Sequence, residues 1–249
     1  MELRINKKYI HSVEDFIKVV SEEHKDLDVH KPDENKVYES FIVIKNYLTS
    51  NDLNNIFKLE MFKFSLNKIQ KLNFTANNIE SIPEIFNSMI ELKIIILNNN
   101  KIQKISNLDN LTKVEKLELR GNKLTKIEGI NNLKNLNKLT LSCNLITNIE
   151  EKDLPQIDSL IELGLFGNYI GIENKKFDKN INDKNVEILK KFADMIKTKF
   201  KNLKGLYIGG NFFTNLNISN DDNNEENTNY KEIIKNIIPG IVIDGQNTM

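Results

Sequence analysis

The feature that most constrains the fold of this chain is a motif that recurs about every 22 residues. In the clearest copy, Leu117 and Leu119 are followed at fixed spacing by Asn122 and Leu124. The same apolar pattern surrounds an asparagine in six copies, and we call these residues the ladder asparagines: Asn77, Asn100, Asn122, Asn144, Asn168 and Asn211. A period of this length is typical of solenoids, in which one structural unit stacks on the next.

Each copy of the motif predicts one coil of such a solenoid. The two leucines at alternate positions predict a short strand that points both side chains into the core. A turn follows at the asparagine, whose side-chain amide can pair with backbone groups that a tight buried turn leaves without partners. Because a single coil cannot bury its own apolar face, we expect the coils to stack and their strands to form a parallel sheet.

The pattern resembles the leucine-rich repeat of intracellular proteins, over residues 38–170 and 203–245. This resemblance implies an α/β fold, namely a right-handed leucine-rich repeat solenoid (horseshoe) with a concave parallel β-sheet. A degenerate copy around Asn46 gives six or seven repeats within residues 38–216. The residue before each ladder asparagine is small or polar, and these residues are Ala76, Asn99, Gly121, Cys143, Gly167 and Gly210.

Both ends of the solenoid have sequences that favour caps. Ser12 and Asp15 are spaced as in a capping box, so a helix is expected over 12–24 within an N-terminal helical cap of residues 1–37. The segment from Tyr230 to Gly245 resembles the C-terminal cap of intracellular leucine-rich repeat proteins. A helical insertion is expected at about 175–202, and residues 217–249 are expected to hold an acidic loop and the C-terminal cap.

The composition narrows the classes of function. The chain has 35 basic and 35 acidic residues, and its basic residues are almost all lysines. Because base recognition in nucleic acids relies largely on arginine, nucleic-acid binding is not expected. A single cysteine cannot form an internal disulfide, which favours an intracellular protein, cytoplasmic or nuclear. Because the longest aliphatic run is only Ile94–Leu97, no membrane span is expected.

No catalytic or metal-binding pattern is recognisable in the sequence. His11, His24 and His30 lie near Asp26 and Asp28, but their spacing fits no local metal motif. Cys143 occupies a small-residue position of the repeat and has no histidine near it in sequence. We therefore expect no enzyme activity, no metal and no cofactor. The alternative class is an enzyme whose catalytic residues form no recognisable set.

The alternation within each strand predicts which side chains lie on the concave face, and this face is the candidate site for a partner protein. Its predicted contact residues are Ile94, Ile96, Lys116, Glu118, Arg120, Lys138, Glu162, Phe166 and Tyr207. Phe166 and Tyr207 stand beside glycines, an arrangement that predicts a recess for a partner's side chain. The alternative is that the inserted helix or the C-terminal loop covers these two aromatic residues.

The resemblance also suggests kinds of partner. The 22-residue period resembles the leucine-rich regulatory subunit of protein phosphatase 1, and the cap and the helix at the start resemble the leucine-rich light chain of outer-arm dynein. These resemblances imply a non-catalytic scaffold or regulatory subunit, with a phosphatase or a motor or cytoskeletal subunit as candidate partner. For the chain itself, a monomer is favoured.

Overall fold

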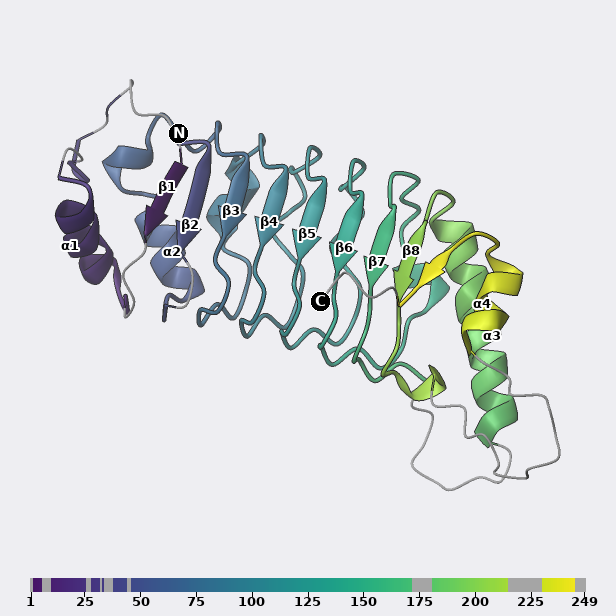
Figure 1. Ribbon diagram of the computed structural model, residues 1–249. Coiled ribbons are helices and arrows are strands. Elements are labelled where there is room, and N and C mark those ends of the chain that lie inside the picture. Colours follow the sequence, from purple (N-terminus) through teal and green to yellow (C-terminus); the bar gives the residue numbers. More distant parts are fainter. Residues whose placement is uncertain are drawn as a thin grey trace.

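The computed structural model describes residues 2–5, 10–25, 28–31, 33, 38–43, 46–171, 181–214 and 230–244. These residues form a solenoid with one parallel sheet, whose strands neighbour one another in chain order (Figure 1). The strands are β1 (Glu2–Ile5), β2 (Ser40–Val43), β3 (Lys71–Asn73), β4 (Ile94–Ile96), β5 (Lys116–Glu118), β6 (Lys138–Thr140), β7 (Glu162–Gly164), β8 (Gly205–Tyr207) and β9 (Val242–Ile243). The predicted α/β leucine-rich repeat fold with a concave parallel sheet is confirmed.

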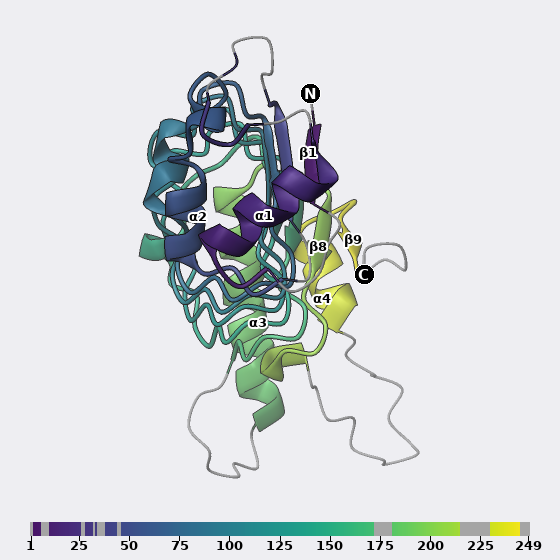
Figure 2. The same cartoon turned by 90° about the vertical axis from the view of Figure 1, so that its left-hand side faces the viewer.

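Helices lie at the two ends and on the convex side, where they replace parts of the coils (Figures 1 and 2). The α-helices are α1 (Val13–Glu23), α2 (Ser50–Ile56), α3 (Ile181–Lys199) and α4 (Tyr230–Ile237). Short 3-10 helices are η1 (Glu60–Phe62), η2 (Glu84–Ser88), η3 (Glu151–Asp153) and η4 (Phe212–Thr214). α3 lies within the range predicted for the insertion, whereas the expected acidic loop at 217–229 lies outside the described residues.

The strands follow the predicted alternation. In β3 to β6 the middle residue is buried and its two neighbours are half-buried, because the middle side chain points into the core and the others point to the concave face. The strands stay in register across the sheet, so that Leu117 neighbours Ile95 on one side and Leu139 on the other. Each buried column therefore runs through the whole solenoid as one continuous core.

The ladder asparagines tie adjacent coils together. The side-chain nitrogen of Asn122 donates to the carbonyl oxygens of Leu97 and Leu119, each at 3.0 Å. Its side-chain oxygen accepts a hydrogen bond from the backbone N–H of Ile102 at 3.0 Å. The other ladder asparagines repeat this pattern, and Asn46 accepts from the backbone N–H of Ile10 in the same way at 2.9 Å. The degenerate first copy therefore has the same ladder contact as the others.

The residue before each ladder asparagine has a left-handed backbone. Its φ angle lies between 55° and 72° in all six copies, including Cys143 at 56°. Glycine adopts this conformation without strain and asparagine adopts it more readily than most residues, whereas a β-branched or bulky side chain would be strained. The preference for small or polar residues at this position thus has a backbone cause.

At the N-terminal end, the structure adds a strand that the sequence reading overlooked. β1 pairs in parallel with β2, and its Leu3 and Ile5 point into the core. Residues 1–37 are therefore not a purely helical cap. The predicted helix is present as α1, with Ser12 accepting a hydrogen bond from the backbone N–H of Asp15. Phe16 of α1 packs edge-on against Phe41 at 5.8 Å between ring centroids, which covers the first coil.

At the C-terminal end, Asp244 closes the sheet after β9. Its carboxylate accepts hydrogen bonds from the backbone N–H groups of Ile208 at 2.8 Å and Gly209 at 3.0 Å. The hydroxyl of Tyr230 in α4 donates to the same carboxylate at 2.6 Å. Partial burial, together with this hydrogen bond, raises the pKa of the Tyr230 hydroxyl well above its usual value. The resemblance to a C-terminal cap thus corresponds to a real contact between its first and last parts.

The cap contact leads to a stability prediction. Asp244→Ala should lower the free energy of unfolding by about 2–3 kcal/mol, because two backbone N–H groups and the Tyr230 hydroxyl lose their acceptor. Tyr230→Phe should cost only about 1 kcal/mol, since Asp244 keeps its two backbone donors. Urea unfolding followed by circular dichroism measures both values. Equal losses for the two variants would contradict a cap organised around Asp244.

Candidate protein-binding face

The concave face is built from the side chains on either side of each buried strand residue. Ile94 and Ile96 both lie half-buried on β4 and form an apolar pair in the sheet. Lys71 of β3 neighbours Ile94 on one side, and Lys116 of β5 neighbours it on the other. Ile94 is thus flanked by two lysines, whereas Ile96 lies between Asn73 and Glu118.

The charges in the middle of the concave face are paired with one another. The ammonium of Lys116 contacts the carboxylate of Glu118 at 2.6 Å, and the ammonium of Lys138 contacts the carboxylate of Glu162 at 2.6 Å. The side-chain nitrogen of Asn98 also donates to Glu118 at 2.8 Å. These ion pairs balance the charges of Lys116 and Lys138 and hold the four side chains in place, so that a partner would meet ordered polar groups there.

Near the C-terminal end, the structure differs from the recess that the glycines predicted. A Cβ atom added to Gly209 would lie 3.3 Å from the ring of Phe166, and one added to Gly205 would lie 3.2 Å from the hydroxyl of Tyr207. The two rings therefore rest on the glycine backbones and occupy the space that the missing side chains leave. The result is an aromatic surface, with Phe166 still 40% exposed.

The inserted helix does not cover these aromatic residues. α3 lies on the side of the sheet away from the concave face (Figures 1 and 2), and its residues Leu189, Ala193 and Ile196 are buried in the core. The backbone N–H of Ile157 on the convex side donates to the carbonyl of Lys199 at 3.1 Å. The C-terminal loop after residue 216, which was the other segment expected to cover Phe166 and Tyr207, lies outside the described residues.

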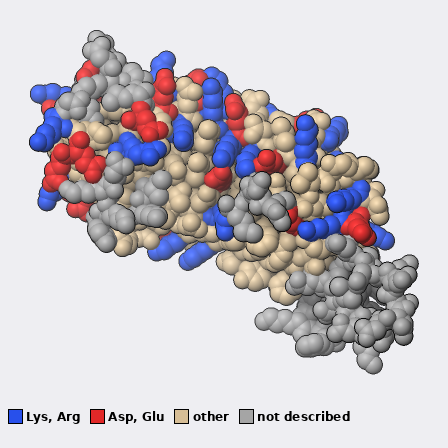
Figure 3. Space-filling model, in the orientation of Figure 1, with Lys and Arg blue, Asp and Glu red and all other residues tan. Residues whose placement is uncertain are grey.

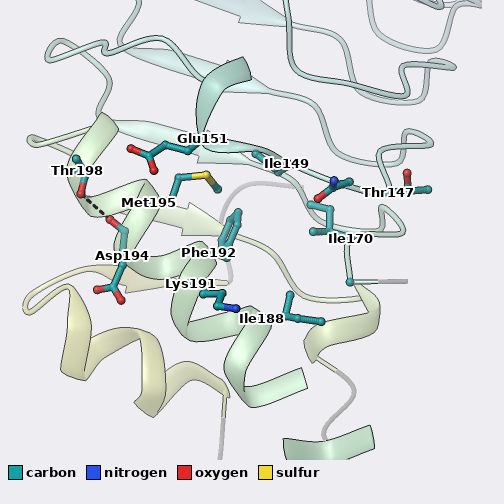
Figure 4. A pocket seen from close by; sticks show the side chains of 12 residues that line it. Thr147, Ile149, Glu151, Ile170, Ile188, Lys191, Phe192, Asp194, Met195 and Thr198 are labelled. Atoms are coloured by element: carbon teal, nitrogen blue, oxygen red, sulfur yellow. Dashed lines mark hydrogen bonds between the residues drawn. The ribbon is translucent and has the colours of Figure 1, made fainter. Parts of the chain in front are cut away.

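A groove of about 640 Å³ separates α3 from the neighbouring coils (Figure 4). Its apolar lining comes from Ile149 and Ile170 of the coils and from Ile188, Phe192 and Met195 of α3. Polar groups also line it, among them Thr147, Glu151, Lys191, Asp194 and Thr198.

The sequence reading missed an apolar row on the edge of the solenoid. The residue directly after the ladder asparagine is exposed in three successive coils, at Leu145 (42%), Tyr169 (42%) and Phe212 (44%). The rings of Tyr169 and Phe212 stack with their centroids 6.2 Å apart. We call these three residues the lateral stripe. Aligning the copies on their ladder asparagines would have revealed it, but the reading followed only the strand positions.

The candidate metal ligands that the structure describes, His11, His24, His30 and Asp28, do not form a metal-binding cluster. His11 stacks on Tyr47 with 4.3 Å between ring centroids, and the ring nitrogen Nε2 of His24 lies 3.3 Å from the backbone oxygen of Arg4. Asp28 accepts a hydrogen bond from the backbone N–H of His30, whereas Asp26 lies outside the described residues. Among the residues that the structure describes, no cluster of three or more His, Cys, Asp or Glu side chains is arranged to hold a metal ion. None of the described helices is both long and apolar enough to cross a membrane.

Comparisons with known proteins agree with this architecture. The sequence model of the family described as "Leucine Rich repeats (2 copies)" matches residues 112–156, which include the ladder asparagines Asn122 and Asn144. The chain is a leucine-rich repeat solenoid. A sequence search among curated proteins gave no significant match for this solenoid.

Among solved structures, the TLR13–ssRNA13 complex matches the solenoid with a TM-score of 0.54 and 18% identity, over 85% of this chain and 26% of that one. An internalin from Listeria monocytogenes matches with a TM-score of 0.49 and 20% identity, over 70% of this chain and 48% of that one. The Leptospira interrogans protein LIC12759 matches with a TM-score of 0.48 and 20% identity, over 72% and 44%. The chain thus spans about half or less of the length of these proteins, and at such identities the likeness concerns the fold alone.

Proposed function

We propose that this solenoid is a protein-interaction scaffold that binds a partner protein on its concave face. The observation that carries the proposal is the exposure of Phe166 on the concave side, although the other face of the sheet packs on a continuous core. Large apolar side chains that remain accessible on a well-ordered surface mark interaction sites more often than scattered small ones do. Ile94 and Ile96 on β4 provide a second apolar area, in the coil next to the ion pair of Lys116 with Glu118.

The charges of the concave face suggest the chemistry of the partner surface. Because Lys116 and Lys138 already have carboxylate partners, binding would not depend on a strongly acidic partner. Apolar side chains that reach Phe166 and the isoleucine pair would supply most of the affinity, and polar groups between them would select the partner. A mixed protein surface of ordinary net charge fits this face best.

The identity of the partner is a finer proposal. A regulatory subunit of a phosphatase is supported by the 22-residue period, and a motor or cytoskeletal light chain is supported by the helix at the start and the C-terminal cap. Both readings use the same concave face. Mass spectrometry of the proteins that the wild-type chain retains from a lysate would distinguish them.

The concave face can be tested by adding charge to it. The double variant Ile96→Asp with Phe166→Asp should reduce partner retention about tenfold or more, because each carboxylate must be desolvated against an apolar surface. Both side chains point away from the core, so far-UV circular dichroism and the melting temperature should change little.

The matched control is Ile90→Asp, which adds a carboxylate at an exposed isoleucine in the turn before β4. This variant should retain the partner as well as the wild type does. Full retention by the double variant, or an equal loss with the control, would contradict binding on the concave face.

A further inference from the structure

The lateral stripe continues a row of lysines along the same edge of the solenoid. Leu145, Tyr169 and Phe212 directly follow their ladder asparagines, and Lys101 and Lys123 hold the same position in the two preceding coils. Backbone hydrogen bonds between coils fix this alignment: the N–H of Lys123 donates to Ile102, that of Leu145 to Leu124, and that of Tyr169 to Ile146, at 2.8 to 2.9 Å. The residues from Lys101 to Tyr169 therefore lie in one row, and the stacking of Tyr169 on Phe212 extends it to the last coil.

The two halves of the row differ in chemistry. Two more exposed lysines lie three residues after the first two, so that the basic half consists of Lys101, Lys104, Lys123 and Lys126. The segments 101–104 and 123–126 contain no acidic residue, and in the described ranges none of the four lysines is in an ion pair. In Figure 3 the lower edge has blue groups in its middle and uncharged surface nearer to the C-terminal end.

The nearby acidic groups do not neutralise the basic half. Glu150 in the next coil forms an ion pair with Lys152 at 2.6 Å. The hydrogen bond from Lys152 and the positive charge of Lys152 are the main reasons why the pKa of Glu150 is lowered. The charge of Lys126 lowers this pKa further, by a smaller amount. The basic half of the row therefore keeps an unpaired positive charge.

We propose that this edge is a second docking site, which binds an extended acidic segment of a partner protein with its apolar residues over the lateral stripe. The charge of the row indicates an acidic ligand, whose carboxylates would pair with the four lysines. Apolar side chains of the same segment would cover Leu145, Tyr169 and Phe212. Neighbouring coils are roughly 4.8 Å apart, so the row is roughly 19 Å long, which about six extended residues would span.

The order of the chemistry along the row favours a peptide over a nucleic acid. A single strand of RNA carries phosphates along its whole length and needs cations beside its stacked bases. Here the positive charge ends at the coil of Lys123, before the aromatic residues begin. The stripe also leads to the groove beside α3, because Thr147 and Gly171 line that groove and lie two residues after Leu145 and Tyr169. An additional apolar side chain of the segment would fit there.

In the experiment, the full chain is immobilised and used to select binders from a phage library of random peptides. The peptides have about twelve residues, which is about twice the number needed to span the row. The expected consensus has clustered acidic residues followed by two or more aliphatic or aromatic ones. A fluorescein-labelled consensus peptide is then titrated with the full chain by fluorescence anisotropy. Raising the salt concentration should weaken its binding, because exposed charges are screened.

Two variants test the two halves of the row. Lys101→Glu with Lys123→Glu, and separately Tyr169→Ser with Phe212→Ser, should each raise the Kd of the peptide about tenfold or more. The matched charge control is Lys134→Glu with Lys201→Glu, two exposed lysines that lie ten residues before their ladder asparagines and thus away from the row. That control should leave the Kd within about twofold, and circular dichroism verifies folding of all variants.

Several results would overturn the proposal. One is a library selection without acidic and apolar residues in the consensus. Another is a selected peptide whose Kd changes in the Phe166→Asp variant but not in the row variants. This result would show that the peptide binds to the concave face. Tighter binding of an oligouridylate of similar length to the same row would assign the site to RNA. A dimer in analytical ultracentrifugation that Tyr169→Ser abolishes would assign it to a second copy of the chain.

Discussion

Replacing Asn122 by alanine should lower the free energy of unfolding by about 4 kcal/mol, a large part of the stability of a typical domain. The substitution leaves the N–H of Ile102 without an acceptor. It also removes three donor contacts, to the carbonyls of Leu97, Leu119 and Arg120. The carbonyls of Leu97 and Leu119 keep a second donor, from Asn100 and Asn144 respectively. Asn122 is itself buried, and water cannot reach these groups without opening the turn. The unpaired N–H of Ile102 costs about 1–3 kcal/mol, and each lost hydrogen bond to a carbonyl adds about 0.5–1.5 kcal/mol.

The position of Asn122 in the middle of the solenoid adds a second expectation. In a repeat protein each coil contacts only its neighbours, so a weakened central interface can separate the unfolding of the two halves. Urea unfolding of Asn122→Ala, followed by circular dichroism, should therefore show a broader transition or two transitions. A single transition at the wild-type urea concentration would contradict a structural role for the ladder.

The matched control for this variant is Asn131→Ala. Asn131 is exposed, and its side chain makes no hydrogen bond within the described part of the chain. Its replacement should change the free energy of unfolding by less than about 0.5 kcal/mol. The comparison separates the effect of the ladder position from any general effect of removing an asparagine.

Gly129→Ala should lower the free energy of unfolding by about 3 kcal/mol. Gly129 has a φ angle of 69°, which strains any residue with a Cβ by about 1 kcal/mol. An added Cβ would also overlap the carbonyl oxygen of Ile105 in the preceding coil. Because backbone atoms cannot move aside as a flexible side chain can, the two coils would have to separate, which costs about 1–3 kcal/mol more.

Gly240→Ala is a matched control for Gly129→Ala. Gly240 has a similarly positive φ angle of 81°, but an added Cβ would meet no atom within 4 Å. This variant should show the conformational strain alone, about 1 kcal/mol. Thermal and urea unfolding measure both variants side by side. Equal destabilisation would mean that contact between the coils at Gly129 contributes nothing beyond backbone strain.

Much of the fold could be predicted because the repeat is a local pattern. The buried strand residues, such as Leu117, and the ladder role of Asn122 follow from spacing alone, since inward and outward positions alternate along any strand. β1 was missed although Glu2–Ile5 alternates polar and apolar residues, because no ladder asparagine follows it at the repeat spacing. A search restricted to the complete motif cannot find a strand that lacks the rest of it.

The candidate site was less predictable, because it depends on what lies beside each residue in the next coil. The sequence placed Phe166 and Tyr207 on the concave face beside glycines and suggested an empty recess. In the structure each ring rests on a glycine backbone, Phe166 on Gly209 and Tyr207 on Gly205. Sequence spacing shows that a glycine leaves room, but only the stacked coils show which side chain takes that room.

The 22-residue repeat thus determined the solenoid, its core and the asparagine ladder from sequence alone. These depend on interactions that recur in every coil, so one period specifies them all. The tertiary structure decided which exposed side chains act together: the pairing of Lys138 with Glu162, the position of α3 away from the concave face, and the continuous row from Lys101 to Phe212. The physical reason is that these contacts join coils whose side chains differ, and only stacking brings them side by side.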